Sequence, residues 1–225
     1  MKGRLIVFEG TDGSGKSTQF RLLCQRLEER GQSFEKLIFP QYQEESSALI
    51  RMYLGGEFGS HPDDVNAYAA SSFYAVDRYA AWKKKWGTLY RAGGLVLSDR
   101  YTTSNAVHQG SKLSGEERPE FFRWLFDFEY GRLGLPEPDL VIWLDMPIER
   151  SVEMLRGRES ATHTKGDIHE VDTAYLTKCY ATAAAAAAQF GWRRVPCTDA
   201  AGAVRDMEEI RAEIWSAVES SGLLK

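Results

Sequence analysis

The chain is poor in cysteine, lacks long apolar runs and carries no excess of positive charge, and each shortage excludes a class of protein. Its 225 residues include three cysteines, too far apart for a CxxC pair or a metal-ligand spacing: Cys24, Cys179 and Cys197. No segment reaches the ~18 apolar residues that a transmembrane helix needs. A formal net charge of −4 gives no general attraction to nucleic acid or to an anionic membrane. We therefore expect a cytoplasmic protein with reduced thiols that binds neither nucleic acid nor membranes.

Signatures of export and of hydrolysis are missing as well. The N-terminus leads almost directly into an apolar segment and a glycine loop, without the charged region and long apolar stretch of a signal peptide. No G-x-S-x-G elbow occurs, and the four histidines form no H-E-x-x-H motif. Trp82–Trp86 (WKKKW) combines basic and aromatic residues, but a solvated helix face with inward tryptophans explains it better than a nucleic-acid patch.

What is present is the pattern of an α/β domain. The length and a composition of 43% hydrophobic and 27% charged residues fit one globular domain, residues 1–225. Five short apolar runs are typical of buried strands: Arg4–Glu9, Phe34–Phe39, Leu95–Asp99, Leu140–Leu144 and Trp192–Pro196. Helical stretches alternate with them: Ser17–Arg30, Val65–Tyr90, Glu117–Tyr130, Ile148–Arg156, Asp172–Phe190 and Val204–Val218. Such alternation predicts a five-stranded parallel sheet flanked by helices on both faces, a three-layer sandwich.

One segment departs from this regular pattern. Gly157–Gly166 (GRESATHTKG) is polar, bounded by glycines and devoid of large apolar side chains, so we expect a mobile surface loop there. It is the candidate for a short lid, at about residues 156–167.

A phosphate-binding motif follows the first predicted strand. Gly10–Ser17 (GTDGSGKS) matches G-x-x-x-x-G-K-[ST] and opens a predicted helix, so backbone N–H groups and the helix dipole converge on one point. Glycines allow close backbone approach, Lys16 would reach the outer phosphates of ATP, and Ser17 would bind Mg²⁺. The predicted ATP-binding residues are Gly10, Gly13, Ser14, Gly15, Lys16, Ser17 and Thr18. A glycine-rich structural turn is the alternative.

A carboxylate and an arginine end the third predicted strand. Apolar residues followed by Asp99 resemble a Walker B strand, and the carboxyl end of a parallel strand is where such a sheet binds ligands. Asp99 would act on Mg²⁺, directly or through water, and Arg100 would stabilise phosphate charge during transfer. An ordinary Asp–Arg surface pair is the alternative.

In combination, these motifs resemble the thymidylate kinases. That family joins an FEGxDGxGKST-like loop, an FP segment, a DRY segment and a short arginine-bearing lid, which here are Phe8–Thr18, Phe39-Pro40, Asp99–Tyr101 and Arg156–Arg158. The resemblance covers nearly the whole chain. It implies a P-loop NTPase fold, a homodimer, and transfer of a phosphoryl group from ATP, with Mg²⁺, to dTMP.

The resemblance also implies an acceptor site. Asp12 would accept a hydrogen bond from the sugar 3′-hydroxyl, although an aspartate in a loop also stabilises turns. Tyr74 and Arg78, four residues apart on one helix face, would stack on thymine and bond its carbonyl or the phosphate, whereas Phe73 is expected in the core. The remaining implied substrate-binding residues are Phe39, Pro40, Tyr42, Arg100, Tyr101, Ser104, Asn105, His108 and Gln109. Ser104 and Asn105 would equally suit a helix N-terminus.

Two departures from the family pattern concern the acceptor. His108 stands where relatives often carry an aromatic residue against the 2′ face of the sugar, which affects the exclusion of ribonucleotides. Gln41 and Tyr42 follow Phe39-Pro40 where relatives place an arginine for the acceptor phosphate. Either the arginines at 51, 78 and 100 suffice, or this phosphate is held differently.

Catalytic positive charge is expected from the lid. Some relatives carry an arginine in the P-loop, whereas others have glycine there and basic residues in the lid. This chain resembles the second type, because it has Gly13 in the P-loop and Arg156 and Arg158 at the lid. Arg158 is the first candidate and Arg156 the second, while Lys165 is better explained as a solvated loop lysine. Two alternatives stay open: a kinase of the same fold acting on another deoxynucleotide or a deoxynucleoside, and a nucleotide-binding switch without phosphoryl transfer.

Overall fold

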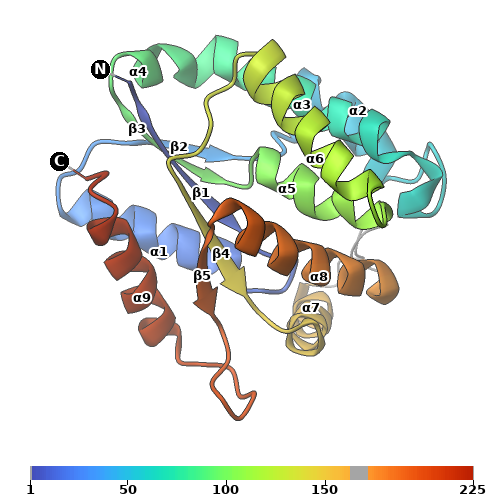
Figure 1. Ribbon diagram of the computed structural model, residues 1–225. Helices are drawn as coiled ribbons and strands as arrows, with labels where there is room; N and C mark the ends of the chain where they lie inside the picture. The colour runs from blue at the N-terminus through green and yellow to red at the C-terminus, as the bar shows by residue number, and fades with distance from the viewer. Residues whose placement is uncertain (1, 163–171, 225) are drawn as a thin grey trace.

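A central parallel sheet organises the chain. The structure is a computed structural model that describes residues 2–162 and 172–224. Five parallel strands form one sheet, as the sequence predicts, and the structure places them in the order β2-β3-β1-β4-β5 (Figure 1). Their bounds are β1 Arg4–Glu9, β2 Glu35–Ile38, β3 Leu95–Asp99, β4 Leu140–Asp145 and β5 Arg193–Pro196. Each strand begins and ends within one residue of the bounds of the predicted run.

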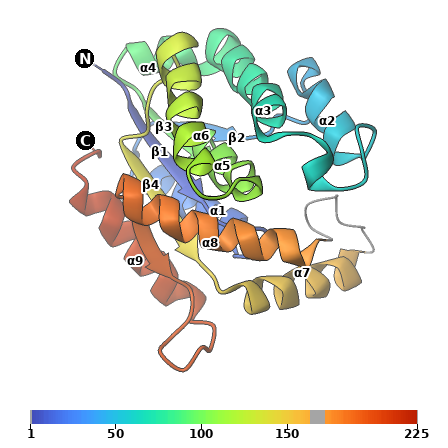
Figure 2. The same cartoon turned by 45° about the vertical axis from the view of Figure 1, so that its right-hand side comes forward.

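Helices cover both faces of this sheet. Along β1, Leu5 and Val7 belong to one buried cluster, and Ile6 and Phe8 belong to the other. The second cluster packs against α1 (Lys16–Glu29) and α9 (Met207–Ser220), which lie side by side on one face (Figures 1 and 2). The first packs against α3 (Ala67–Ala81), α5 (Thr102–His108), α6 (Glu117–Phe126) and α8 (Thr173–Phe190). The three-layer prediction is therefore confirmed.

The long helix predicted at Val65–Tyr90 is divided. After α3, the chain forms a π-helical turn, η3 (Trp82–Trp86), and then α4 (Gly87–Arg91). Trp82 and Trp86 are buried while the three lysines between them are exposed, so the solvated helix face is confirmed. A second π-helical turn, η5 (Asp127–Arg132), extends α6. Neither π-helical turn was predicted, because a π turn adds one residue to a helical turn without changing the composition of the segment.

Several short elements were not predicted. They are α2 (Ala48–Leu54) and the 3₁₀ turns η1 (Glu45–Ser47), η2 (Pro62–Asp64) and η4 (Gly110–Lys112), whereas α5 was anticipated only as the helix N-terminus that Ser104 and Asn105 would suit. Helices of one or two turns show too few repeats for a periodic signal.

The helix before the lid is longer than predicted. α7 runs from Ile148 to Thr162, so the prediction of a loop from Gly157 onward is wrong for residues 157–162. Gly157 alone does not end a helix, since one helical glycine costs only about 1 kcal/mol. The rest of the predicted lid, residues 163–167, lies outside the described residues.

No helix in the described part of the chain is long and apolar enough to cross a membrane. Cys24, Cys179 and Cys197 are all buried and free.

Candidate active site

The sheet brings the two phosphate motifs together. β1 pairs with both β3 and β4, and Phe8 on β1 lies opposite Asp99 on β3. The N–H of Arg100 donates to the carbonyl of Phe8 at 3.0 Å. The P-loop and the DRY segment therefore leave neighbouring strands at the carboxyl edge, where chain connections diverge and open parallel sheets bind ligands.

The P-loop ends at a helix N-terminus without a protein cap. Gly13 and Gly15 have φ values of 81° and 79°, in the left-handed region that favours glycine. No described side chain caps α1, and its first turn carries no acidic residue. The hydroxyl of Ser14 is buried and has no hydrogen-bond partner among the described residues. The Ser14 hydroxyl and the first backbone N–H groups of α1, which have no partner within the helix, form a site for an anion such as phosphate together with the dipole of α1.

Lys16, Ser17 and Asp99 meet beside this anion site. Lys16 Nζ forms a buried ion pair with Asp99 Oδ1, and Ser17 Oγ donates to Asp99 Oδ2 at 3.4 Å. Burial and the charge of Arg100 lower the pKa of Lys16, and Asp99 opposes that effect. One hydroxyl and one carboxylate fit Mg²⁺, which uses few protein ligands and takes others from substrate phosphates. Within the described residues, no cluster of three His, Cys, Asp or Glu could hold a metal by itself.

Helix α7 packs directly on the P-loop. A Cβ at Gly13 would lie 2.2 Å from the backbone carbonyl oxygen of Ser151 and 3.0 Å from Leu155 Cγ. The hydroxyls of Thr11 and Ser151 are 3.4 Å apart. Position 13 therefore has no room for any side chain, including an arginine.

The acceptor residues implied by the resemblance line one cavity of about 130 Å³. All twelve contribute: Asp12, Phe39, Pro40, Tyr42, Tyr74, Arg78, Arg100, Tyr101, Ser104, Asn105, His108 and Gln109. Leu54, on α2, is the lining residue that was not predicted. Tyr101 is fully buried, and its hydroxyl donates to the carbonyl of Pro136 at 3.1 Å.

Arg100 connects this cavity to the P-loop. It adopts a left-handed backbone conformation with φ of 67°, which is uncommon outside glycine and typical of functional positions. Its Nη2 lies 2.5 Å from Asp12 Oδ1, and its Nη1 lies 3.6 Å from Glu9 Oε1. Burial disfavours the charge on Arg100, but Asp12, Glu9 and Asp99 outweigh burial and raise its pKa. The guanidinium stays charged between donor and acceptor sites.

Glu9 was not predicted as a site residue. Its carboxylate is buried at the end of β1 and accepts from Gly10 N at 3.1 Å, from Thr103 Oγ1 at 2.8 Å and from Ser104 Oγ at 2.8 Å. It thereby joins the P-loop to the start of α5. The available signal was a glutamate at the end of an otherwise apolar strand, since charged residues are buried only when paired.

Arg78 and Arg51 have partners within the protein. Arg78 is buried and forms a bidentate ion pair with Glu129, at 2.7 and 2.5 Å. Arg51 instead donates to the carbonyls of Tyr42 and Glu44, at 2.8 and 3.1 Å, and so stabilises the turn after Phe39-Pro40. Of the two, Arg78 is the one that lines the cavity.

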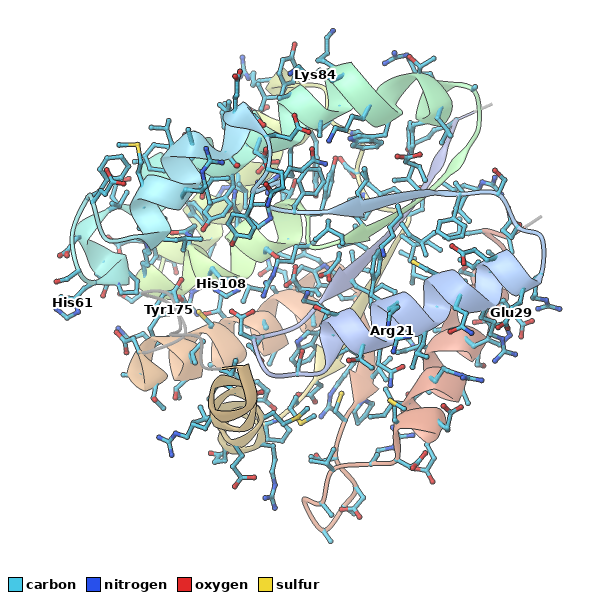
Figure 3. All side chains as sticks on the ribbon, turned by 180° about the vertical axis from the view of Figure 1, so that it is seen from behind. Arg21, Glu29, His61, Lys84, His108 and Tyr175 are labelled. Carbon is cyan, nitrogen blue, oxygen red and sulfur yellow. The ribbon has the colours of Figure 1, made fainter. Side chains whose placement is uncertain are left out.

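His108 is buried between α5 and α8, where it lies beside Tyr175 (Figure 3). Its Nε2 is 3.2 Å from Arg100 Nη1, and its Nδ1 is 3.6 Å from the sulfur of Cys179. Since arginine is only a donor, Nε2 accepts and the ring proton is assigned to Nδ1. Burial, with the charge of Arg100, lowers the pKa of His108 from 6.5 to about 4. The imidazole is therefore neutral at physiological pH.

This shift predicts a loss of stability in acid. Below pH 6.5 the unfolded chain binds a proton at His108, whereas the folded protein does not until about pH 4, so stability falls as pH decreases through this window. The loss at the acid end is about 3 kcal/mol. Denaturant unfolding of His108→Phe between pH 4 and 6.5 should show a shallower slope than the wild type. The exposed His61 (Figure 3) provides the control, because His61→Gln should keep the wild-type slope; equal slopes for wild type and His108→Phe would contradict the assignment.

The lid arginines are only partly described. Arg156 is exposed on α7, whereas the side chain of Arg158 and all of Lys165 lie outside the described residues.

Comparison with known proteins agrees with this geometry. The sequence model described as thymidylate kinase matches residues 8–207. This chain belongs to the thymidylate kinase family. Thymidylate kinase of Mycobacterium tuberculosis is 34% identical over 190 residues, which cover 84% of this chain and 87% of that protein. The enzyme of Synechococcus sp. (strain WH7803) is 29% identical over 228 residues, which cover 100% of this chain and 99% of that protein.

A solved structure supports the P-loop NTPase fold. Thymidylate kinase from Candida albicans superposes with a TM-score of 0.71 over 99% of this chain and 93% of that chain, at 20% sequence identity. Members of the thymidylate kinase family are nucleoside monophosphate kinases that use ATP as phosphate donor.

Proposed function

We propose that this protein transfers the γ-phosphoryl group of ATP to dTMP, forming ADP and dTDP. The main observation in support of this proposal is that the phosphate-binding site and the acceptor cavity adjoin each other. The anion site of the P-loop and the acceptor cavity meet at the Asp12–Arg100 pair, 2.5 Å apart. A donor on one side and an acceptor on the other would have their phosphates next to the same guanidinium, as in-line transfer requires.

The donor half would use the P-loop backbone, Lys16, Ser17 and Asp99. The N–H groups at the start of α1 would hold the phosphates of ATP, and Lys16 would stabilise negative charge on the outer phosphate oxygens. Ser17 and Asp99 would hold Mg²⁺, which neutralises phosphate charge during transfer.

The acceptor half would use the residues that line the cavity. Asp12 would accept from the 3′-hydroxyl, Arg100 would bind the acceptor phosphate, and Tyr74 would stack on the base. Gln109 is evidence that the cavity binds a polar base. The residue is only 1% exposed, yet neither its amide nitrogen nor its amide oxygen has a hydrogen-bond partner among the described residues. A buried amide without partners is costly, and a base edge that both donates and accepts would satisfy it.

The lid would supply further positive charge. Because α7 packs on Gly13, the P-loop has no space for a catalytic arginine, and the C-terminal part of α7 carries Arg156 and Arg158 instead. Replacing Arg158 with alanine is expected to lower kcat by about 10²-fold while the KM for ATP changes little. An unchanged kcat would remove Arg158 from the mechanism, and Arg150→Ala, at a half-exposed arginine on the first turn of α7, is the matched control.

We further propose a cytoplasmic homodimer. Leu49 on α2 and Val76 and Tyr79 on α3 are exposed by 43%, 53% and 37%, an apolar set that a second copy would cover. Light scattering should give twice the chain mass of 25.4 kDa. A monomer at micromolar concentration would contradict the dimer.

The decisive experiment is a coupled assay of ADP formation with a panel of acceptors: dTMP, dUMP, dCMP, dGMP and thymidine. We expect the highest kcat/KM with dTMP. A preference for another member of the panel would identify a kinase with a different substrate. Absence of ADP formation with every acceptor would favour a non-catalytic nucleotide-binding protein.

A further inference from the structure

Glu129 connects two of the helices that line the acceptor cavity, α3 and α5. It lies on the π-helical turn η5, and its side chain is fully buried. Arg78 reaches it from α3, whereas Thr102 and Asn105 reach it from α5. π-Helical turns are rare and frequently occur at functional sites.

The two carboxylate oxygens of Glu129 accept four hydrogen bonds. Oε2 accepts from Arg78 Nε at 2.7 Å and from Thr102 Oγ1 at 2.8 Å. Oε1 accepts from Arg78 Nη2 at 2.5 Å and from Asn105 Nδ2 at 3.2 Å. Since a buried carboxylate is costly without charge and hydrogen-bond partners, these donors are held toward Glu129.

This arrangement determines which atoms remain for a ligand. Asn105 Nδ2 also donates to the carbonyl of Ser71 at 3.1 Å, so two acceptors face this end of the amide and it must be the NH₂ group. The other end, Oδ1, is an acceptor. On Arg78, Nε and Nη2 are engaged, and Nη1 makes only a long contact, 3.4 Å, with the carbonyl of Tyr101. The cavity therefore offers a donor from α3 and an acceptor from α5.

We propose that Glu129 sets the base selectivity of this site. By holding the donor Arg78 in place and by turning the Asn105 amide so that its acceptor Oδ1 remains, it makes the cavity complementary to a pyrimidine with a C4 carbonyl and an N3–H, such as thymine. Cytosine presents the opposite pattern, an amino donor and an N3 acceptor, and would leave buried groups unpaired. This inference rests on the proposed function. Glu129 is a positioning residue, because it acts through Arg78 and Asn105.

Glu129→Gln tests the inference with minimal change in volume. The amide carries an NH₂ group in place of one acceptor oxygen, which removes one of the two acceptors that hold Asn105 Nδ2 and leaves only the carbonyl of Ser71. Asn105 can then turn over and offer Nδ2 to the base. We expect the ratio of kcat/KM for dTMP to that for dCMP to fall about tenfold or more. The KM for ATP should stay within about twofold of the wild type. Glu120→Gln, at an exposed glutamate on α6, is the matched control and should keep the wild-type ratio.

The outcomes separate this inference from the proposed function. A wild-type enzyme without preference for dTMP over dCMP would overturn both. A selective wild type and a folded Glu129→Gln variant with a ratio within about twofold of it would overturn the role of Glu129 alone, since a merely structural residue affects both acceptors equally. If Glu129→Gln does not fold, Glu129→Asp keeps the charge but is one methylene too short to contact both helices, and the same fall in selectivity is expected.

Discussion

Replacing Lys16 with methionine is expected to lower kcat by about 10²- to 10³-fold. Lys16 is 7% exposed and pairs with Asp99 at the mouth of the anion site. In this poorly solvated position, its charge would stabilise the outer phosphate oxygens far more than a solvated lysine does. Methionine keeps most of the side-chain volume, so the expected loss is of charge rather than of packing. Steady-state kinetics with saturating ATP and dTMP measures the effect.

The control for Lys16→Met is a lysine without access to the site. Lys84 is exposed on η3, at the outer surface of the protein (Figure 3). Lys84→Met should therefore keep wild-type kcat. If Lys16→Met retained kcat within about threefold of the wild type, with an unchanged midpoint of thermal unfolding, the charge of Lys16 would not take part in transfer.

Replacing Gly13 with alanine is expected to destabilise the protein by about 2–5 kcal/mol, the combined cost of a left-handed backbone and an overpacked contact. The added Cβ would lie 2.2 Å from the carbonyl oxygen of Ser151, and neither backbone can yield without moving α7 or the P-loop. Such a displacement should also lower kcat by about 10²-fold, because phosphoryl transfer tolerates little misplacement. Denaturant unfolding without nucleotide, followed by kinetics, measures both effects.

Gly15 offers a matched comparison within the same loop. Its φ of 79° nearly equals the 81° of Gly13. However, a Cβ added at Gly15 would meet no atom of the surrounding described residues within 4 Å. Gly15→Ala should therefore show the backbone cost alone, about 1–2 kcal/mol. Equal destabilisation by the two substitutions would mean that α7 does not restrict Gly13.

The acceptor site shows how far sequence reasoning extends. Tyr74 and Arg78 were assigned to one helix face by their spacing, and both line the cavity. Glu9 and Glu129 were not assigned, because their partners lie up to 95 residues away in the chain. The bonding of a buried carboxylate depends on which elements meet around it, and no local pattern reports that.

By itself the sequence determined the alternation of five strands with the long helices, the P-loop and the family. These features depend on apolar periodicity, glycine positions and short motifs, all of which are local. Only the tertiary structure decided that α7 occupies the space beside Gly13, that Arg100 pairs with Asp12, and that Glu129 orients Arg78 and Asn105. The physical reason is that close packing and buried hydrogen bonds depend on the distance between elements, which composition and spacing do not specify.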